Sequence, residues 1–334
     1  FGGAGYRTLC VDPAVPVTER DAQGADLRTT AFLQPARDFL DEIGLWARVA
    51  DAAEDLQVMR IVDAGGETPH PRLTRDFDAA DISARPFGWN VSNWLLRREF
   101  TAALADMDSV DHRQGRGVSG LFSRFGEARV RLDDGTQVSA RLAVAADGRN
   151  STLRRAAGIG VRTFRYGQKA LAFAVTHNAP HGNVSTEIHR SGGPFTLVPL
   201  PDRDGKPCSA VVWMETGAEA DRLHALPPDE FSAAATHRSG ELYGPLTLTG
   251  NRTLWPIISQ IADRFAGERL ALVAEAAHVV PPIGAQGLNM SLADIADIVG
   301  RARASDDPGA PDILAAYARR RRPEVAARVL GVDA

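Results

Sequence analysis

Cysteine is scarce in this chain, and its scarcity excludes several kinds of protein. Cys10 and Cys208 are the only two in 334 residues, and they lack the spacing of a metal-ligand motif or a redox pair. A disulfide framework and a cysteine-rich metal site are therefore excluded. Both cysteines lie in apolar, strand-like stretches, so we expect buried free thiols and a reducing, cytoplasmic location.

Long apolar runs are missing as well. No stretch reaches the roughly 18 consecutive apolar residues that would predict a transmembrane helix, and the residues after Phe1 do not resemble a signal peptide. The formal net charge of −4 at pH 7 disfavours a nucleic-acid partner. The chain is long enough for one large folded domain or two ordinary ones.

The most informative stretch runs from Leu270 to Asp294. Leu270 to Val273 is an apolar run that predicts a buried strand, and a helix is predicted over 288–304. A turn of small residues with Glu275 and His278, then a loop rich in proline and glycine, separates the two. A helix start with few side chains directs backbone N–H groups and the positive end of the helix dipole at one point. This suits a flat ring that gains negative charge when reduced, as a flavin does.

This segment resembles the C-terminal flavin motif of class A aromatic monooxygenases, which have the p-hydroxybenzoate hydroxylase fold. Within that family it is most similar to the ubiquinone-biosynthesis hydroxylases. Three further blocks in matching order extend the resemblance over nearly the whole chain: Asp26–Trp46, Ala143–Ile159 and Tyr166–Leu200. The resemblance implies an α/β fold, in which a mostly antiparallel substrate-binding sheet domain is inserted into a Rossmann-like FAD/NAD(P)-binding domain.

The pattern along the chain agrees with two kinds of domain. Strands predicted at 170–176, 184–189, 195–200, 209–214 and 246–255, with helices near 218–226 and 230–238, differ from the α/β material on either side. That flanking material includes a helix over 35–49 and a final helix over 311–329. We therefore expect an FAD-binding domain of residues 1–67, 87–160 and 259–334, and a sheet domain of residues 68–86 and 161–258.

The start of the chain predicts an incomplete nucleotide-binding unit. Thr8 to Val11 is a predicted strand that ends at Asp12, and an acidic residue in this place on a second strand holds the adenosine ribose. The phosphate-binding glycine turn should lie about 20 residues earlier. We therefore expect the chain to lack its first strand and GxGxxG turn, as a fragment would. The alternative for Asp12 is a turn residue before Pro13.

The resemblance implies FAD as cofactor and assigns several residues to its phosphates. Arg28 is implied to meet the pyrophosphate, since guanidinium suits paired phosphate oxygens. Asn93 and Arg97 are two candidates for one polar position at the start of a helix. Asp147 and Gly148 form the family's DG motif beside the pyrophosphate. The structural alternatives are a solvated arginine, plain surface, and an N-capping turn.

Other residues are implied to face the rest of the flavin. Glu275 is assigned to the ribityl hydroxyls, and Ala274 replaces the usual glycine, which we expect to weaken binding. The residues implied to face the isoalloxazine are Pro282, Gly284, Gly287, Leu288 and Asn289. We expect His278 to be structural, with a catalytic role as the weaker alternative. No other catalytic residue and no metal ligand is assigned.

The implied reaction is aromatic hydroxylation. An FAD-dependent monooxygenase would use NAD(P)H and O2, through a C4a-hydroperoxyflavin, on a polyprenylated phenol or quinol of ubiquinone biosynthesis. The block His181–Asn183 is similar to the ubiquinone group and favours the lipid-tailed substrate. The first alternative is a hydroxylase of a small soluble aromatic compound. The second is a flavin-free remnant that serves as a binding or assembly subunit.

Four consecutive arginines, Arg319–Arg322, lie on the last predicted helix. Such a run is usually a solvated face, and contact with anionic lipid headgroups is the alternative. We expect a cytoplasmic protein, with peripheral contact to the inner membrane or to a biosynthetic complex as a second expectation.

Overall fold

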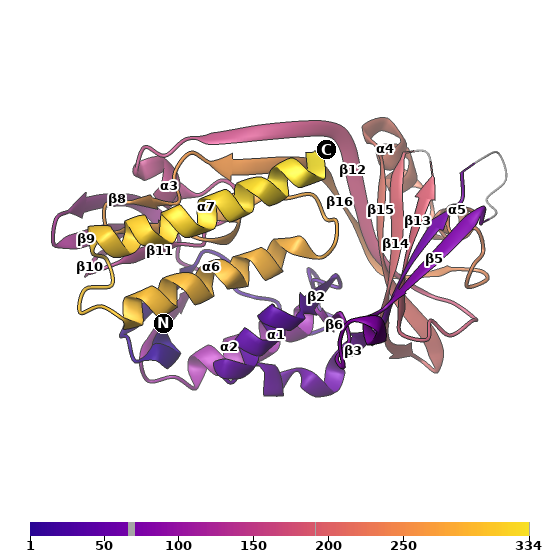
Figure 1. The fold of residues 1–334 in the computed structure, drawn as a ribbon, viewed down its shortest axis with the longest axis horizontal. Coiled ribbons are helices and arrows are strands. Elements are labelled where there is room, and N and C mark those ends of the chain that lie inside the picture. The colour runs from indigo at the N-terminus through magenta and orange to yellow at the C-terminus, as the bar shows by residue number, and fades with distance from the viewer. Residues whose placement is uncertain (66–70, 191, 334) are drawn as a thin grey trace. The chain divides into compact units, whose positions relative to one another are not determined.

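The structure is a computed structural model that describes residues 1–65, 71–190 and 192–333 (Figure 1). The chain divides into two compact units. Unit 1 contains Phe1–Pro16, Phe100–Phe164 and Ile258–Ala334, and unit 2 contains Val17–Glu99 and Arg165–Ile257. Residues 68–70 of the predicted segment 68–86 lie outside the described residues.

Unit 1 is built on short parallel strand pairs. β1 (Thr8–Asp12) pairs with β7 (Val110–Gln114), and β11 (Ala143–Ala145) pairs with β18 (Leu270–Leu272). β18 is fully buried, which is why its sequence is apolar at every position. The remaining elements of this unit are η1 (Gly2–Ala4), β8 (Val118–Arg124), β9 (Glu127–Leu132), β10 (Gln137–Ala140), α3 (Thr152–Ala156), β17 (Ala266–Gly267), η5 (Ala274–Ala276) and β19 (His278–Val279).

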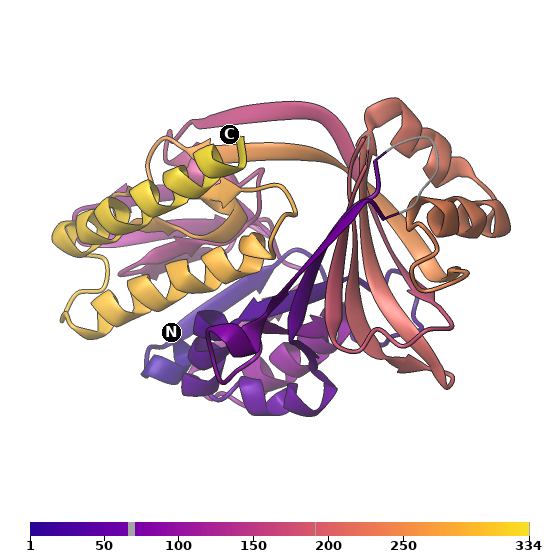
Figure 2. The same cartoon turned by 45° about the vertical axis from the view of Figure 1, so that its right-hand side comes forward.

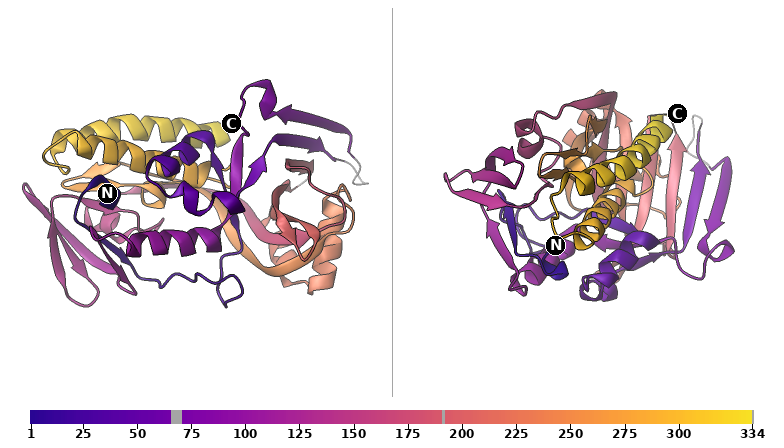
Figure 3. Two further views of the ribbon diagram at one scale, coloured as in Figure 1. Left: turned by 90° about the horizontal axis from the view of Figure 1, so that it is seen from below. Right: turned by 60° about the vertical axis from the view of Figure 1, so that its left-hand side comes forward.

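Two long helices complete unit 1. α6 (Gln286–Arg303) and α7 (Pro311–Asp333) lie side by side (Figures 1 and 3), close to their predicted ranges. Their buried residues join the strands in one core, which includes Met290, Ile298 and Tyr317. The Tyr317 hydroxyl donates to the Leu272 carbonyl oxygen at 2.6 Å, and burial raises its pKa. This bond fixes α7 against β18.

Unit 2 contains most of the large sheet, whose strands fan out in Figure 2. Their order is β12 (Val161–Thr176), β15 (Lys206–Thr216), β14 (Gly193–Arg203), β13 (Val184–Arg190), β4 (Val58–Asp63) and β5 (Leu73–Asp78). Neighbours are antiparallel except β13 and β4. The predicted strands of this region, including β16 (Thr247–Ala262), and helices α4 (Gly217–Ala225) and α5 (Pro228–Arg238) are confirmed.

β4 was not expected in this sheet, because it lies in the segment 1–67 that was assigned to the FAD-binding domain. The alternating burial of Val58–Asp63 made a strand predictable, but its partner β13 is more than 120 positions away, and no local pattern encodes that pairing. β5 lies in the segment 68–86, which was assigned to the sheet domain. The predicted domains are defined by what they bind, so their assignment stays a prediction.

A smaller sheet of unit 2 includes β2 and leads into α1, the helix of the Asp26–Trp46 block. β6 (Gly88–Ser92) lies between β2 (Thr29–Leu33) and β3 (Glu54–Leu56). The helix predicted over 35–49 is too long, because α1 (Gln34–Glu42) stops before Gly44, whose φ of 74° ends it. The short turns η2 (Trp46–Arg48) and η3 (Ala50–Ala52) follow α1, and η4 (Ala79–Asp81) follows β5. The helix α2 (Asn93–Ala105) follows β6.

Two sequence expectations can be compared with the structure directly. Cys208 is buried and Cys10 is only partly buried, so the expectation of buried thiols holds for Cys208 alone. Within the described residues, no helix combines the length and apolarity needed to cross a bilayer.

His177 should make the stability of unit 2 depend on pH. Its Nδ1 lies 2.8 Å from the Ala179 carbonyl oxygen and its Nε2 lies 2.9 Å from the Ser209 hydroxyl. Burial lowers the His177 pKa, whereas the unfolded chain takes up a proton near pH 6.5. The free energy of unfolding should therefore fall as the pH drops below about 6.5. Urea denaturation of His177→Gln should show a shallower fall, and the exposed His237→Gln is the matched control.

Candidate functional site

The start of α6 is bare. Its N-cap residue, Ala285, has φ 55° and makes no side-chain capping bond, and Gly284 before it has φ 62°. A Cβ built on Gly287 meets nothing within 4 Å. The first-turn amides therefore carry the positive end of an 18-residue helix to an uncovered surface.

The side chains around this helix start are unusually available. Pro282 is exposed, and Leu288 is 38% exposed although it is a large apolar residue. The Asn289 amide donates to the Ala285 carbonyl oxygen at 2.6 Å. Within the described residues, the Oε1 atom of Gln286 is buried without a hydrogen-bond partner. A ligand with a flat apolar face and an N–H group would complement these features.

The turn after β18 adds a carboxylate. Glu275 is exposed, and no partner of its carboxylate is found in the described parts of the chain. Ala274 before it has φ 54°, and its N–H donates to Asp294 Oδ2 at 3.1 Å. A left-handed backbone favours glycine over alanine at this position, so the departure that the resemblance implied at Ala274 lies in a strained backbone conformation.

Ala274→Gly should stabilise the protein. A left-handed conformation at alanine costs about 1–2 kcal/mol of folding free energy, which glycine avoids. Glycine also gives the unfolded chain more conformational freedom, which offsets about 0.4–1 kcal/mol of this gain. We expect a net gain of about 0.5–1 kcal/mol in the free energy of unfolding by chemical denaturation. Ala327→Gly, in the exposed middle of α7, should instead lose about 1 kcal/mol. Equal losses in both variants would contradict the strain at Ala274.

A buried ionic cluster holds this turn. Asp294 accepts from His278 Nε2 at 2.7 Å and from Arg321 Nε at 2.8 Å, and Arg321 also pairs with Glu324. His278 is 2% exposed and stacks on Phe265. These contacts are compatible with a structural role, which stays a prediction. Sequence reasoning missed Asp294 and Arg321, although an aspartate among the core-facing positions of a helix is a usable signal.

The DG turn divides into two parts with different roles. The Asp147 carboxylate accepts from Thr152 N at 2.7 Å, from Leu153 N at 3.1 Å and from the Ser151 hydroxyl. It therefore caps α3, which is the structural alternative for this residue. Gly148 has φ 78°, and a Cβ there meets nothing within 4 Å, so its backbone remains open to a ligand.

Arg154 joins the two loops, and sequence reasoning also missed it. Its side chain is 4% exposed, and it donates to the carbonyl oxygens of Ala276 at 2.8 Å and Arg149 at 2.7 Å. Burial lowers its pKa. The DG turn and the η5 turn are thus fixed to each other although more than 120 residues separate them.

Asp12 lies where a ribose carboxylate was expected, at the exposed end of β1. Its Oδ1 accepts from Ala14 N at 2.8 Å, as in the alternative of a turn before Pro13. The local geometry is therefore that of an Asx turn, and the ribose role stays a prediction.

Unit 2 brings its three candidate residues to one carboxylate. Asp26 accepts from Arg28 Nε and Nη2, both at 2.6 Å, from Arg97 Nη2 at 3.1 Å and from Asn93 Nδ2 at 3.3 Å. The Arg28 guanidinium also lies 4.8 Å from the ring centroid of Trp255. Both Asn93 and Arg97 thus contact Asp26, and which of them meets the cofactor stays a prediction. Asp26 was missed as a site residue.

These partners stabilise the negative charge of the Asp26 carboxylate. Burial by itself would raise the pKa of its carboxyl group, but the bond and charge of Arg28, with help from Asn93 and Arg97, keep that pKa below its usual value. Arg28 and Arg97 remain 43% and 42% exposed. Two fixed and accessible guanidinium groups are suited to phosphate oxygens.

Two cavities of the described structure lie away from these candidate residues. A groove of about 630 Å³ borders α7 in unit 1, and a pocket of about 260 Å³ lies beside Arg238 in unit 2. No predicted cofactor residue lines either of them. In the described ranges, no group of three or more histidine, cysteine or acidic side chains is arranged to hold a metal.

Comparison with known proteins assigns this chain to a family. The model of the family described as "FAD binding domain" matches residues 13–331. The chain belongs to this FAD binding domain family. Ubiquinone hydroxylase UbiL of Rhodospirillum rubrum is 34% identical over 307 residues, covering 91% of this chain and 69% of the relative. The 3-demethoxyubiquinol 3-hydroxylase of Escherichia coli is 25% identical, covering 95% and 80%.

Solved structures agree on the fold of this family member. Pseudomonas aeruginosa PqsL in complex with 2-aminobenzoylacetate has a TM-score of 0.82 at 23% identity, covering 98% of this chain and 88% of that one. The flavin-dependent monooxygenase PieE, in complex with FAD and substrate, has a TM-score of 0.78 at 17% identity, covering 98% and 59%. The predicted family, the α/β fold with a Rossmann-like FAD-binding domain, and the FAD cofactor are confirmed.

FAD fits the residues present. In unit 1, the uncapped α6 start, the unpartnered Gln286 oxygen and the uncrowded backbone at Gly148 and Gly287 suit a cofactor with a flat ring and anionic groups. In unit 2, the arginines on Asp26 provide anion-binding groups. The fit of these residues to individual parts of the cofactor remains a prediction.

Proposed function

We propose that this protein is an FAD-dependent monooxygenase that uses NAD(P)H and O2 to hydroxylate the aromatic ring of a polyprenylated phenol or quinol. The observation that carries the proposal is the match along 91% of the chain to a protein named a ubiquinone hydroxylase. A second relative of similar coverage, from Neisseria meningitidis, carries the name ubiquinone hydroxylase UbiM and is 24% identical.

The overall reaction balances without another reactant. One O2 supplies an oxygen atom to the ring and another to water, and NAD(P)H with one proton supplies the two electrons and two hydrogens that the water requires. When bound, FAD would supply hydride acceptance from NAD(P)H and the activation of oxygen. The part of the protein is to bind, orient and stabilise charge.

The α6 start supplies the charge stabilisation in this proposal. Uncapped amides at a helix N-terminus favour negative charge beside them, and a reduced flavin ring is anionic. Leu288 provides an apolar contact and Gln286 an acceptor. Glu275 is assigned to the ribityl hydroxyls, as the resemblance implies, and its carboxylate is exposed.

The phosphates and ribose take the remaining assignments. Arg28 and Arg97, fixed by Asp26, are assigned to the pyrophosphate, with Asn93 beside them. The backbone at Gly148 is assigned to the same group and Asp12 to the ribose. In this proposal residues 1–67, 87–160 and 259–334 bind FAD, and residues 68–86 and 161–258 bind the substrate of a cytoplasmic enzyme at the inner membrane.

The test is a turnover assay with purified protein, added FAD and 18O2. Prenylated phenols should stimulate NAD(P)H oxidation and yield a product that carries one 18O atom. Stimulation by small soluble phenols alone would support the hydroxylase of a soluble aromatic compound instead. A colourless protein that takes up no added FAD would contradict both enzymes and support the binding or assembly subunit.

A further inference from the structure

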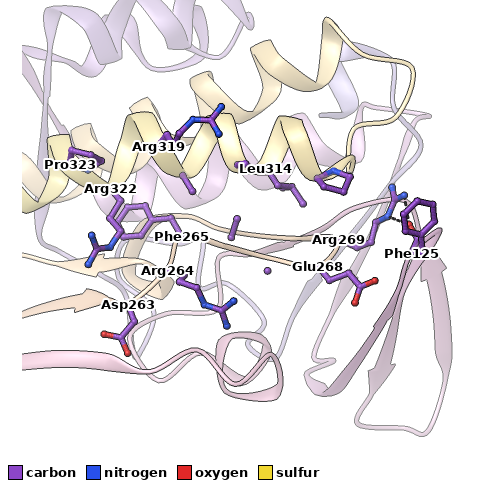
Figure 4. Close-up of a pocket in the computed structure, with 16 residues that line it drawn as sticks. Phe125, Asp263, Arg264, Phe265, Glu268, Arg269, Leu314, Arg319, Arg322 and Pro323 are labelled. Atoms are coloured by element: carbon purple, nitrogen blue, oxygen red, sulfur yellow. Dashed lines mark hydrogen bonds between the residues drawn. The ribbon is translucent and has the colours of Figure 1, made fainter.

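The groove beside α7 has an apolar wall. Its volume is about 630 Å³, and Phe265, Leu314, Ala315 and Ala318 line it, with Pro323 at one end (Figure 4). Phe265 and Leu314 are buried residues of the unit 1 core, so the floor of the groove is the outer layer of that core. An apolar groove of this volume is in the range of small-molecule sites, which is about 300–1,000 Å³.

The four consecutive arginines of α7 separate into two pairs. Arg320 lies 3.3 Å from Asp297 and 3.6 Å from Glu324, and Arg321 is buried on Asp294. Arg319 and Arg322 both line the groove, as their spacing of three positions on one helix allows. The sequence alone could not distinguish these pairs.

The groove arginines lack acidic partners. Within the described residues, no carboxylate lies within ion-pair distance of Arg264, Arg319 or Arg322, although each lines the groove. The Nε atom of Arg322 is buried and has no hydrogen-bond partner there. Three uncompensated guanidinium groups beside one apolar wall favour an anionic occupant.

The other charges of the groove do not cancel this excess. Arg269 is paired with Asp307 at 2.6 Å, and Asp263 lies 3.7 Å from Arg162. Figure 4 shows Glu268 beside Arg269 and Phe125, at the opposite end from Arg322. The groove is thus basic at one end and continues along apolar side chains.

We propose that this groove binds an anionic lipid, with its headgroup at Arg264, Arg319 and Arg322 and its acyl chain along the apolar wall. Guanidinium groups match phosphate oxygens, and burial of an acyl chain along the partly exposed Ala315 and Ala318 and the exposed Pro323 removes apolar surface from water. A small volume with charge at one end suits a single amphiphile better than an acidic protein segment. The proposal is independent of the hydroxylase activity.

Flotation with vesicles is the first test. Full-length protein should float with vesicles that mix phosphatidylglycerol and phosphatidylcholine, and not with phosphatidylcholine alone. Arg319→Gln with Arg322→Gln should weaken this binding about thirty-fold, from about 1 kcal/mol for each arginine at an anionic surface. The control, Arg320→Gln with Arg328→Gln, removes two charges from the same helix outside the groove and should change binding less than about threefold.

Calorimetry with dodecyl phosphate separates the groove from general attraction to a charged surface. Wild-type protein should bind this soluble amphiphile, and Ala315→Glu, which places a carboxylate on the groove wall, should abolish binding with unchanged thermal unfolding. Equal losses in both arginine pairs, equal binding to neutral vesicles, or no binding of dodecyl phosphate would each overturn the proposal. So would binding of an acidic peptide in preference to the vesicles. FAD content, measured in parallel, should not change in any variant.

Discussion

Gly287→Glu should abolish tight FAD binding and leave the protein at least as stable as before. Gly287 is in the first turn of α6, and a Cβ there meets nothing within 4 Å. A carboxylate there interacts favourably with the helix dipole and stabilises the folded protein by about 0.3–1 kcal/mol. It also repels the ring of reduced FAD, which is anionic, by about 4 kcal/mol at 4 Å in a half-screened site. Anaerobic titration with reduced FAD should therefore show a loss of affinity of at least about 100-fold.

Gly300→Glu is the control for this result. It introduces the same side chain on the same helix, at an exposed position where a Cβ also meets nothing within 4 Å. Its FAD affinity should match that of the unmodified protein. If Gly287→Glu bound FAD normally, or if it unfolded more easily, the proposed role of the α6 amides would be wrong.

Asp294→Ala should cause the largest loss of stability. The Asp294 carboxylate is fully buried and serves Arg321, His278 and the Ala274 amide. Removing it leaves the Arg321 charge buried with Glu324 as its remaining acidic partner, and breaking such a pair typically costs about 3–5 kcal/mol. The unfolding temperature should fall by roughly 10 °C. The unfolding temperature of Asp294→Asn should lie between those of Asp294→Ala and the unmodified protein.

The matched comparison is a carboxylate that pairs with an arginine at the surface. Asp76 accepts from Arg60 at 2.7 and 2.8 Å and is 44% exposed. Asp76→Ala should therefore cost no more than about 1 kcal/mol. A similar loss in Asp76→Ala and Asp294→Ala would mean that burial of the cluster around Asp294 contributes nothing special.

Much of the fold could be predicted because its signals are local. The apolar run at Leu270 gave a buried strand, and the helices near 218–226, 230–238 and 288–304 followed from periodicity. The end of α1 at Gly44 was missed because a glycine in a helical pattern can either continue it or terminate it. The sheet position of β4 was missed because it depends on a strand far away in the sequence.

The candidate site was predictable only where residues carry a motif of their own. The loop before α6 has such a motif, and the structure leaves its amides bare as expected. Asp26, Arg154 and Asp294 act through partners that are distant in sequence or burial that emerges only on folding. Asp147 belongs to a motif that predicted contact with the cofactor, but in the structure its carboxylate caps the adjacent helix α3.

The bond between Ala274 and Asp294 bears on how a ligand arrives. One carboxylate holds the Ala274 amide, His278 on the strand that follows and Arg321 on another helix, so the turn cannot open unless all three contacts break together. The recognition surface beside it is therefore preorganised, and a ligand loses little affinity to ordering of the chain. Hydrogen exchange at Ala274 should be slow already in the ligand-free protein, and association should follow one kinetic phase.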